Sequence, residues 1–142
     1  RSSFPRSEIL DFPKTAEEVQ LMEEAIRAAK QAEVVVMVLE GNELTVREDR
    51  SRTSLNLPGR QEELLKAVCA TGKPIILVML DGRAFFYKLR SSSYTCHFTC
   101  LVSGEFCGQA VAEALFGDYN PGGRLAVTFP KSVGQIPFCF SL

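Results

Sequence analysis

Residues 40–54, EGNELTVREDRSRTS, gather the side chains of this sequence that are best suited to acid–base chemistry. The carboxyl and guanidinium groups of the segment are those of Glu40, Glu43, Glu48, Asp49, Arg47, Arg50 and Arg52. A carboxylic acid that donates a proton near neutral pH needs a raised pKa, and arginines can hold a neighbouring anion or sugar hydroxyl. Charge pattern alone is more typical of a solvated loop with exchangeable ion pairs, so both interpretations stay open at this point.

A second group of reactive side chains lies in TCHFTC, where Cys96, His97 and Cys100 have the atoms to bind zinc. Structural zinc sites normally have four protein ligands, and C-H-x-x-C has no second pair at a recognised spacing. His97 is also the only histidine of the chain. We therefore expect neither a metal nor another cofactor here. The five cysteines are an odd number without framework spacing, which favours free thiols over a disulfide scaffold.

Two helix-to-strand units must position these groups. Thr15 and Glu18 form a capping box, and apolar residues then recur at helical spacing, which predicts a helix over residues 15–32. The run EVVVMVLEG follows directly, and its lack of polar alternation predicts a parallel strand at about 33–39, covered on both faces.

The same order recurs further along the chain. Leu64 and Val68 lie on the apolar face of a helix predicted for 59–71, and IILVML predicts a second buried strand at 74–80. A third helix ending at Gly117 and a short strand, LAVTF, follow. Alternating helices and strands predict an α/β fold with a parallel sheet and helices on its faces. Ligands of such sheets bind beyond the carboxyl ends of the strands, where segment 40–54 leaves the first strand.

Length and charge exclude several classes of protein. With 142 residues and 46% apolar content the chain has the size of one domain with its own core. A net charge of −1 and the absence of any phosphate-cradling motif argue against nucleic acid or nucleotide as partner. No apolar run is long enough to cross a membrane. The start, RSSFPRSEIL, has neither an initiator methionine nor a signal segment, so we expect a piece of a longer chain.

Four stretches resemble the C-terminal domain of glycoside hydrolase family 3, in particular bacterial β-glucosidases and β-xylosidases: AAKQAEVVVMVLEG, LNLPGRQEELLKAV, GKPIILVMLDGR and ALFGDYNPGGRLAVTFPKSVGQIPF. They cover about residues 15–83 and 104–140. The resemblance implies a three-layer α/β sandwich with a mainly parallel, flavodoxin-like sheet, here truncated, and makes residues 1–142 a single fragmentary domain. It also favours a periplasmic or extracellular location.

The resemblance further implies an activity. In the family a preceding (β/α)₈ barrel supplies the nucleophilic aspartate, and this domain lends a loop with the acid/base glutamate, so that the pair performs retaining hydrolysis of a β-glucoside or β-xyloside. On this view the isolated chain, without the barrel, does not turn over substrate. Because fold alone does not fix function, a non-catalytic α/β binding or regulatory module is the alternative.

A common form of the family's loop reads E-G-x-D-R-x-x-L-x-L-P-G-x-Q and falls without a gap on residues 48–61. The alignment implies Glu48 as the acid/base and Arg50 and Arg52 as substrate-binding residues. Two positions depart from the motif: Asp49 replaces a glycine and Ser51 an aspartate. Glu43 is the alternative acid/base, because some members have long loops with more than one glutamate.

Between GKPIILVMLDGR and GEFCGQA the family usually carries a third strand ending in a form such as V-P-A-I-L-x-A-W-Y-P-G, yet this chain contains no tryptophan. Read one nucleotide later, the possible codons of residues 94–104 permit I-P-A-I-L-x-A-W-Y-P-G, and those of residues 86–88 permit serine, isoleucine and asparagine. We therefore predict a frameshift that enters near Ala84 and leaves near Gly104. Only Phe98 to Val102 keep strand character.

Overall fold

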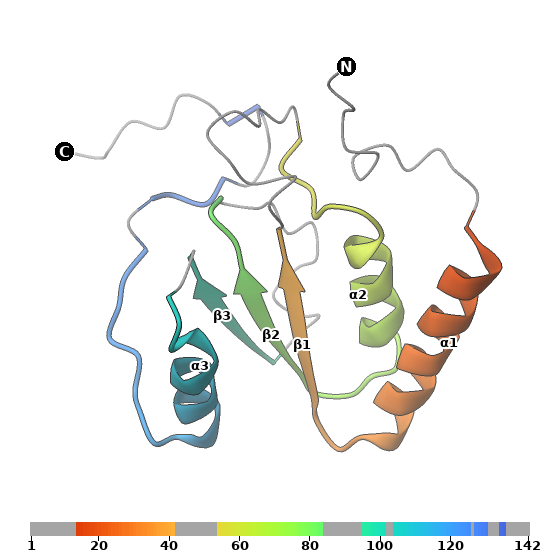
Figure 1. Ribbon diagram of the computed structural model, residues 1–142, viewed down its shortest axis with the longest axis horizontal. Helices are drawn as coiled ribbons and strands as arrows, with labels where there is room; N and C mark the ends of the chain where they lie inside the picture. The colour runs from red at the N-terminus through yellow and green to blue at the C-terminus, as the bar shows by residue number, and fades with distance from the viewer. Residues whose placement is uncertain are drawn as a thin grey trace.

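The computed structural model describes residues 14–41, 54–83, 95–101, 104–125, 127–130 and 134–135. The helices and strands of these residues are α1 (Ala16–Gln31), β1 (Val35–Glu40), α2 (Gln61–Cys69), β2 (Ile75–Leu80), β3 (Cys96–Cys100) and α3 (Cys107–Phe116). The strands form an all-parallel sheet in the order β1-β2-β3. The sheet lies between α3 on one side and α1 with α2 on the other (Figure 1), so the predicted α/β sandwich is confirmed.

Helix α1 begins where its capping box predicts. The Thr15 hydroxyl accepts a hydrogen bond from the Glu18 amide at 3.1 Å, and the Glu18 carboxylate accepts one from the Thr15 amide at 2.9 Å. Both bonds satisfy amides that have no partner within the helix. The observed helix is one residue shorter at each end than the predicted range of 15–32.

The core lies between the sheet and the layer formed by α1 and α2. Val35 of β1 pairs with Ile75 of β2 in a continuous parallel register, which confirms the predicted neighbours. Alternate side chains of both strands point to one face, where Leu65 and Val68 of α2 cover them. The buried cluster consists of Ala29, Met37, Leu39, Leu57, Leu65, Val68, Ile75, Leu77 and Met79. Its members come from both predicted helix-to-strand units.

The opposite face of the sheet is covered unevenly. Val78, in the central strand, is 1% exposed, but Val36 and Val38 of β1 are 49% and 54% exposed. The expectation that the first strand is covered on both faces is therefore wrong. The reason is that β1 is an edge strand, and α3 lies beside β3 at the other edge of the sheet.

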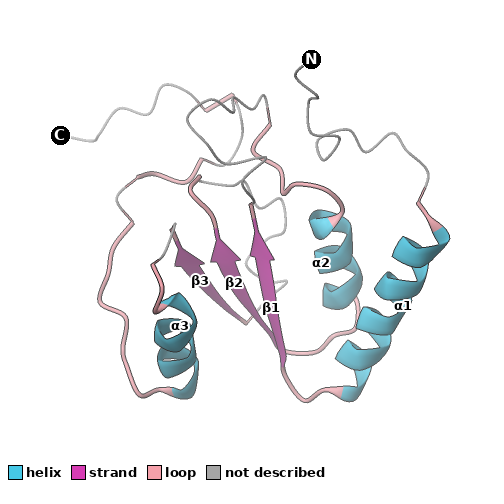
Figure 2. Ribbon diagram, viewed as in Figure 1, coloured by secondary structure: helices cyan, strands magenta, loops and turns pink. Residues whose placement is uncertain are grey.

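The last third of the chain follows the prediction in part. Helix α3 ends at Gly117, which has a φ of 84° and so takes the left-handed conformation that favours glycine. The strand predicted for residues 125–129 is wrong for residues 125 and 127–129, which the structure describes as loop (Figure 2). Strand β3 occupies the edge beside β2, and Leu125 and Val127 remain more than half exposed. Among the described residues no helix is both long and apolar enough to cross a membrane.

Candidate functional site

The carboxyl ends of the three strands meet at one edge of the sheet (Figure 1). The ladder extends one residue past the strands, because the Gly41 amide donates to the Leu80 carbonyl at 3.2 Å and the Asp81 amide donates to the Cys100 carbonyl at 3.1 Å. This edge is where parallel sheets bind ligands. The candidate loop leaves β1 at this edge.

The catalytic and binding side chains predicted from the sequence lie outside the described residues. They are Glu43, Glu48, Arg50 and Arg52, all within residues 42–53. The structure places the two ends of the loop, at Glu40 with Gly41 and at Ser54. The roles of the four side chains therefore stay predictions. The structure describes the contacts that hold the two ends of the loop, which we call its anchors.

The first anchor is a pair of hydrogen bonds between the end of β1 and the start of α2. The Glu40 amide donates to Gln61 Oε1 at 2.9 Å, and Gln61 Nε2 donates to the Glu40 carbonyl at 2.7 Å. The Gln61 side chain thus satisfies both backbone groups of the last residue of β1, as a neighbouring strand would.

The second anchor lies where the loop returns to the fold. The Ser54 hydroxyl accepts a hydrogen bond from the Asn56 amide at 3.1 Å, Leu57 enters the core with 7% exposure, and Pro58 is buried. Gly59 then turns the chain with a φ of 60°, where a residue with a Cβ would be strained. The L-P-G-x-Q part of the motif therefore combines a core anchor, a left-handed turn and the glutamine of the first anchor.

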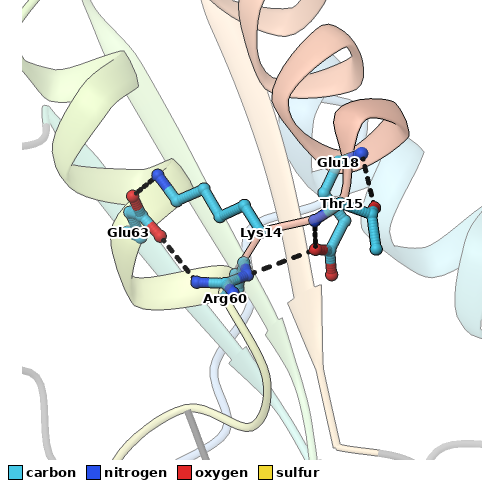
Figure 3. Close-up of polar contacts among 5 residues, drawn as sticks. All are labelled: Lys14, Thr15, Glu18, Arg60 and Glu63. Carbon is cyan, nitrogen blue, oxygen red and sulfur yellow. Dashed lines mark hydrogen bonds and ion pairs between the residues drawn. The ribbon is translucent and has the colours of Figure 1, made fainter. Parts of the chain in front are cut away.

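A polar network joins the starts of α1 and α2 (Figure 3). The Arg60 guanidinium lies 3.6 Å from the Glu18 carboxylate and 3.5 Å from that of Glu63, which also accepts from Lys14. The hydrogen bond from the Thr15 amide lowers the pKa of Glu18, and that from Lys14 lowers the pKa of Glu63. Lowered pKa values keep both groups ionised at neutral pH, which suits an ion-pair network and not a proton donor.

Asp81 and Gln61 are structural residues of this edge that the sequence analysis did not single out. The buried Asp81 carboxylate accepts a hydrogen bond from the Arg83 amide at 2.9 Å and so closes the turn after β2. The sequence pattern that indicates this turn is the Asp-Gly pair directly after an apolar run. Gln61 is part of the L-P-G-x-Q motif, but the motif does not indicate which residue its side chain contacts.

The cysteine and histidine group is divided by the alternation of β3. His97 pairs with Leu77 in the register and lies on the α2 side, whereas Cys96 and Cys100 lie on the other face. The His97 ring instead forms a hydrogen bond with the Thr99 hydroxyl, with 3.0 Å between Nε2 and Oγ1. In the part of the chain that the structure describes, no three metal-binding side chains are grouped.

A pocket of about 430 Å³ lies between β3 and α3. Its walls are mostly apolar, with Phe98 from the strand and Val111 from the helix, and Glu105 is the only carboxylate among the described residues that line it. Burial, with a smaller effect of the adjacent Cys107, raises the pKa of Cys100 at its rim.

Comparison with known proteins identifies relatives over most of the chain. The family model described as "Glycosyl hydrolase family 3 C-terminal domain" matches residues 7–141. A periplasmic beta-glucosidase of Salmonella typhimurium is 41% identical over 121 residues, which are 85% of this chain and 16% of the relative. A beta-xylosidase of Formosa agariphila is 39% identical over 117 residues, 82% of this chain and 16% of the relative. The chain thus spans 16% of the length of these two relatives.

Solved structures show the same likeness. A β-glucosidase from Erythrobacter marinus superimposes with a TM-score of 0.80 at 36% identity, over 88% of this chain and 18% of that one. A beta-glucosidase from Listeria innocua, solved in complex with glucose, gives a TM-score of 0.78 at 28% identity, over 89% of this chain and 17% of its own. Both likenesses cover most of this chain and a small part of a larger enzyme.

Proposed function

Because the chain belongs to glycoside hydrolase family 3 and matches its C-terminal domain over residues 7–141, we propose that it contributes the acid/base loop of a retaining β-glycosidase. The substrate class is a β-glucoside or β-xyloside, which the names of its relatives support. The observation that carries the proposal is the loop itself: it leaves the carboxyl end of a parallel strand and returns through the L-P-G-x-Q motif.

Two carboxyl groups share the work in retaining hydrolysis. A carboxylate from a barrel domain of the longer polypeptide attacks the anomeric carbon, while an acid about 5 to 5.5 Å away protonates the leaving oxygen and then takes a proton from water. We assign the second role to Glu48. Arg50 and Arg52 provide donors for sugar hydroxyls or for the carboxylate. In this proposal the nucleophile belongs to the barrel.

The test uses the chain joined to its barrel domain and compares two kinds of substrate. An aryl glycoside with a poor leaving group needs protonation in the first step, and an activated one does not. We expect Glu48→Gln to lower kcat/KM for the poor leaving group by about 10² to 10⁴-fold and to leave the activated substrate much less affected. An equal loss on both, or no loss, would contradict the assignment.

Glu43→Gln is the matched control, because it makes the same change in the same loop. If Glu48 is the acid, the control retains the ratio of the two kcat/KM values. Added azide gives a second readout, since it can attack the glycosyl-enzyme without help from a base. It should raise kcat of Glu48→Gln on the activated substrate and leave the control unchanged.

A further inference from the structure

The two hydrogen bonds between Gln61 and Glu40 lie at a defined edge of β1. The amides of Val35 and Gly41 donate to the carbonyls of Pro74 and Leu80, so these backbone groups face β2. Backbone groups alternate direction along a strand, and those of Glu40 therefore face the outer edge of the sheet. Gln61 binds both of them there, at 2.9 and 2.7 Å.

Gln61 has little freedom to move away from this position. It is the first residue of α2, and the buried Leu65, one turn later, holds that helix against the sheet. Leu57 and Pro58, just before it, are buried as well. The side chain of Gln61 is thus a short link from a fixed helix to the last residue of β1.

The link joins the two ends of the candidate loop. Residue 41 leaves β1 directly after the bonded Glu40, and the chain returns to the core at Leu57, four residues before Gln61. Fixing both ends of a loop removes conformations that its middle could otherwise sample. The direction in which the chain leaves β1 is therefore set by the Gln61 amide as well as by the sheet.

We propose that Gln61 is a positioning residue for the acid/base loop and acts through its two hydrogen bonds to Glu40. The proposal rests on the proposed function, because the group to be positioned is the acid of that loop. A small displacement of a catalytic group costs rate without a change in the chemistry itself. Loss of the Gln61 amide should therefore reduce proton donation more than substrate binding.

The experiment removes the amide and keeps the shape of the side chain. In the barrel-containing enzyme, Gln61→Met should lower kcat/KM for a poor leaving group by about 10 to 10²-fold relative to an activated one. The ratio of the kcat/KM values for the two substrates, measured on one sample, does not depend on the folded fraction. If Gln61 only stabilised the fold, Gln61→Met would therefore leave this ratio unchanged. Gln109→Met is the control, because the Gln109 side chain donates to Glu113 of the same helix, α3, on the surface.

A second variant, Gln61→Glu, should form both hydrogen bonds again when the pH is lowered. In Gln61→Glu an ionised carboxylate can accept from the Glu40 amide but repels the Glu40 carbonyl, whereas the protonated acid can both accept and donate. The ratio of variant to parent activity on the poor leaving group should therefore rise as the pH falls toward and below about 4.3, the ordinary glutamate pKa.

The two proposals fail in different ways. If Glu48→Gln shows the leaving-group effect but Gln61→Met does not and Gln61→Glu shows no recovery at low pH, the positioning role is overturned and the proposed function stands. If Gln61→Met shows the effect and Glu48→Gln does not, the positioning role stands and the acid is another group of the loop. If neither Glu48→Gln nor Gln61→Met shows the leaving-group effect, both the proposed function and the positioning role are contradicted.

Discussion

His97 of β3 lies beside a leucine of the neighbouring strand, β2. It pairs with Leu77, which is fully buried on the α2 side of the sheet, and is itself half-buried with Thr99 as a partner. Burial lowers the pKa of His97, since an imidazolium loses solvation there. The shifted reading frame would give isoleucine at this position. A polar ring thus stands where an apolar side chain fits the surroundings.

We expect His97→Ile to stabilise the chain, on the order of 1 kcal/mol at neutral pH, because apolar surface replaces a partly desolvated ring. The gain should grow at lower pH. The pKa of His97 is lowered in the folded state, so below the ordinary value of 6.5 the unfolded chain binds a proton that the folded chain resists, and stability falls as the pH falls.

Urea denaturation at pH 7.5 and 5.5 measures both effects. The parent should lose stability between the two values, and His97→Ile should lose less, as His97 is the only histidine in the chain. Equal pH dependence of the two proteins would show that His97 does not titrate differently on folding.

At the scale of elements, α2 contributes more buried residues to the core than α1 or α3. Leu65 is 1% exposed and belongs to the buried cluster with residues of β1 and β2, whereas Leu21 on α1 is 57% exposed. Leu65→Ala should lower the free energy of unfolding by about 2 to 5 kcal/mol, since it removes buried methyl groups and leaves a cavity. The same change at Leu21 should cost at most about 0.5 kcal/mol. Equal shifts of the urea midpoint would contradict the packing described for α2.

The elements were predictable to the extent that their signals are local. The capping box at Thr15 and the apolar runs of β1 and β2 depend on neighbours in the sequence, and those elements were predicted within a few residues. The exposed face of β1 was not predictable, because it depends on which helix lies over which strand. The strand expected at 125–129 was wrong for residues 125 and 127–129, because pairing with a sheet depends on tertiary packing and not on the apolar run alone.

The candidate site was predictable only as a motif. The alignment fixed which residues to test, but the partner of Gln61 lies 21 residues away and carries no pattern of its own. A contact between a side chain and a distant backbone depends on how α2 packs against the sheet. The anchors of the loop therefore emerged from the structure, and the roles of Glu48, Glu43, Arg50 and Arg52 stay predictions.

At the scale of the whole molecule, the region from β3 to α3 is the least well packed. Strand β3 has no residue in the buried cluster, none of the ten residues of α3, all of them described, is buried, and an apolar pocket separates the two. Strand β3 lies within residues 84–104, the segment for which we predict a frameshift. The shifted frame permits tryptophan, then tyrosine or phenylalanine, directly after Cys100, which lines this pocket.

The frameshift prediction is tested on the gene. Read one base later between the codons of Ala84 and Gly104, the DNA should contain no stop and should spell a peptide close to P-A-I-L-x-A-W-Y-P. Tryptophan is the sharpest part, because it requires a Leu101 codon that ends in TG before the G of Val102. A shifted frame with stops or an unrelated peptide would make residues 84–104 a true insertion.

The order of the strands in the sheet is also the order in which a ribosome makes them. Each strand after β1 therefore pairs with the strand made immediately before it. The members of the buried cluster lie between Ala29 and Met79, so this part of the core can assemble while the rest of the chain is still being translated. The predicted change of reading frame near Ala84 comes after β2, so it leaves the residues of β1, α2 and β2 unchanged.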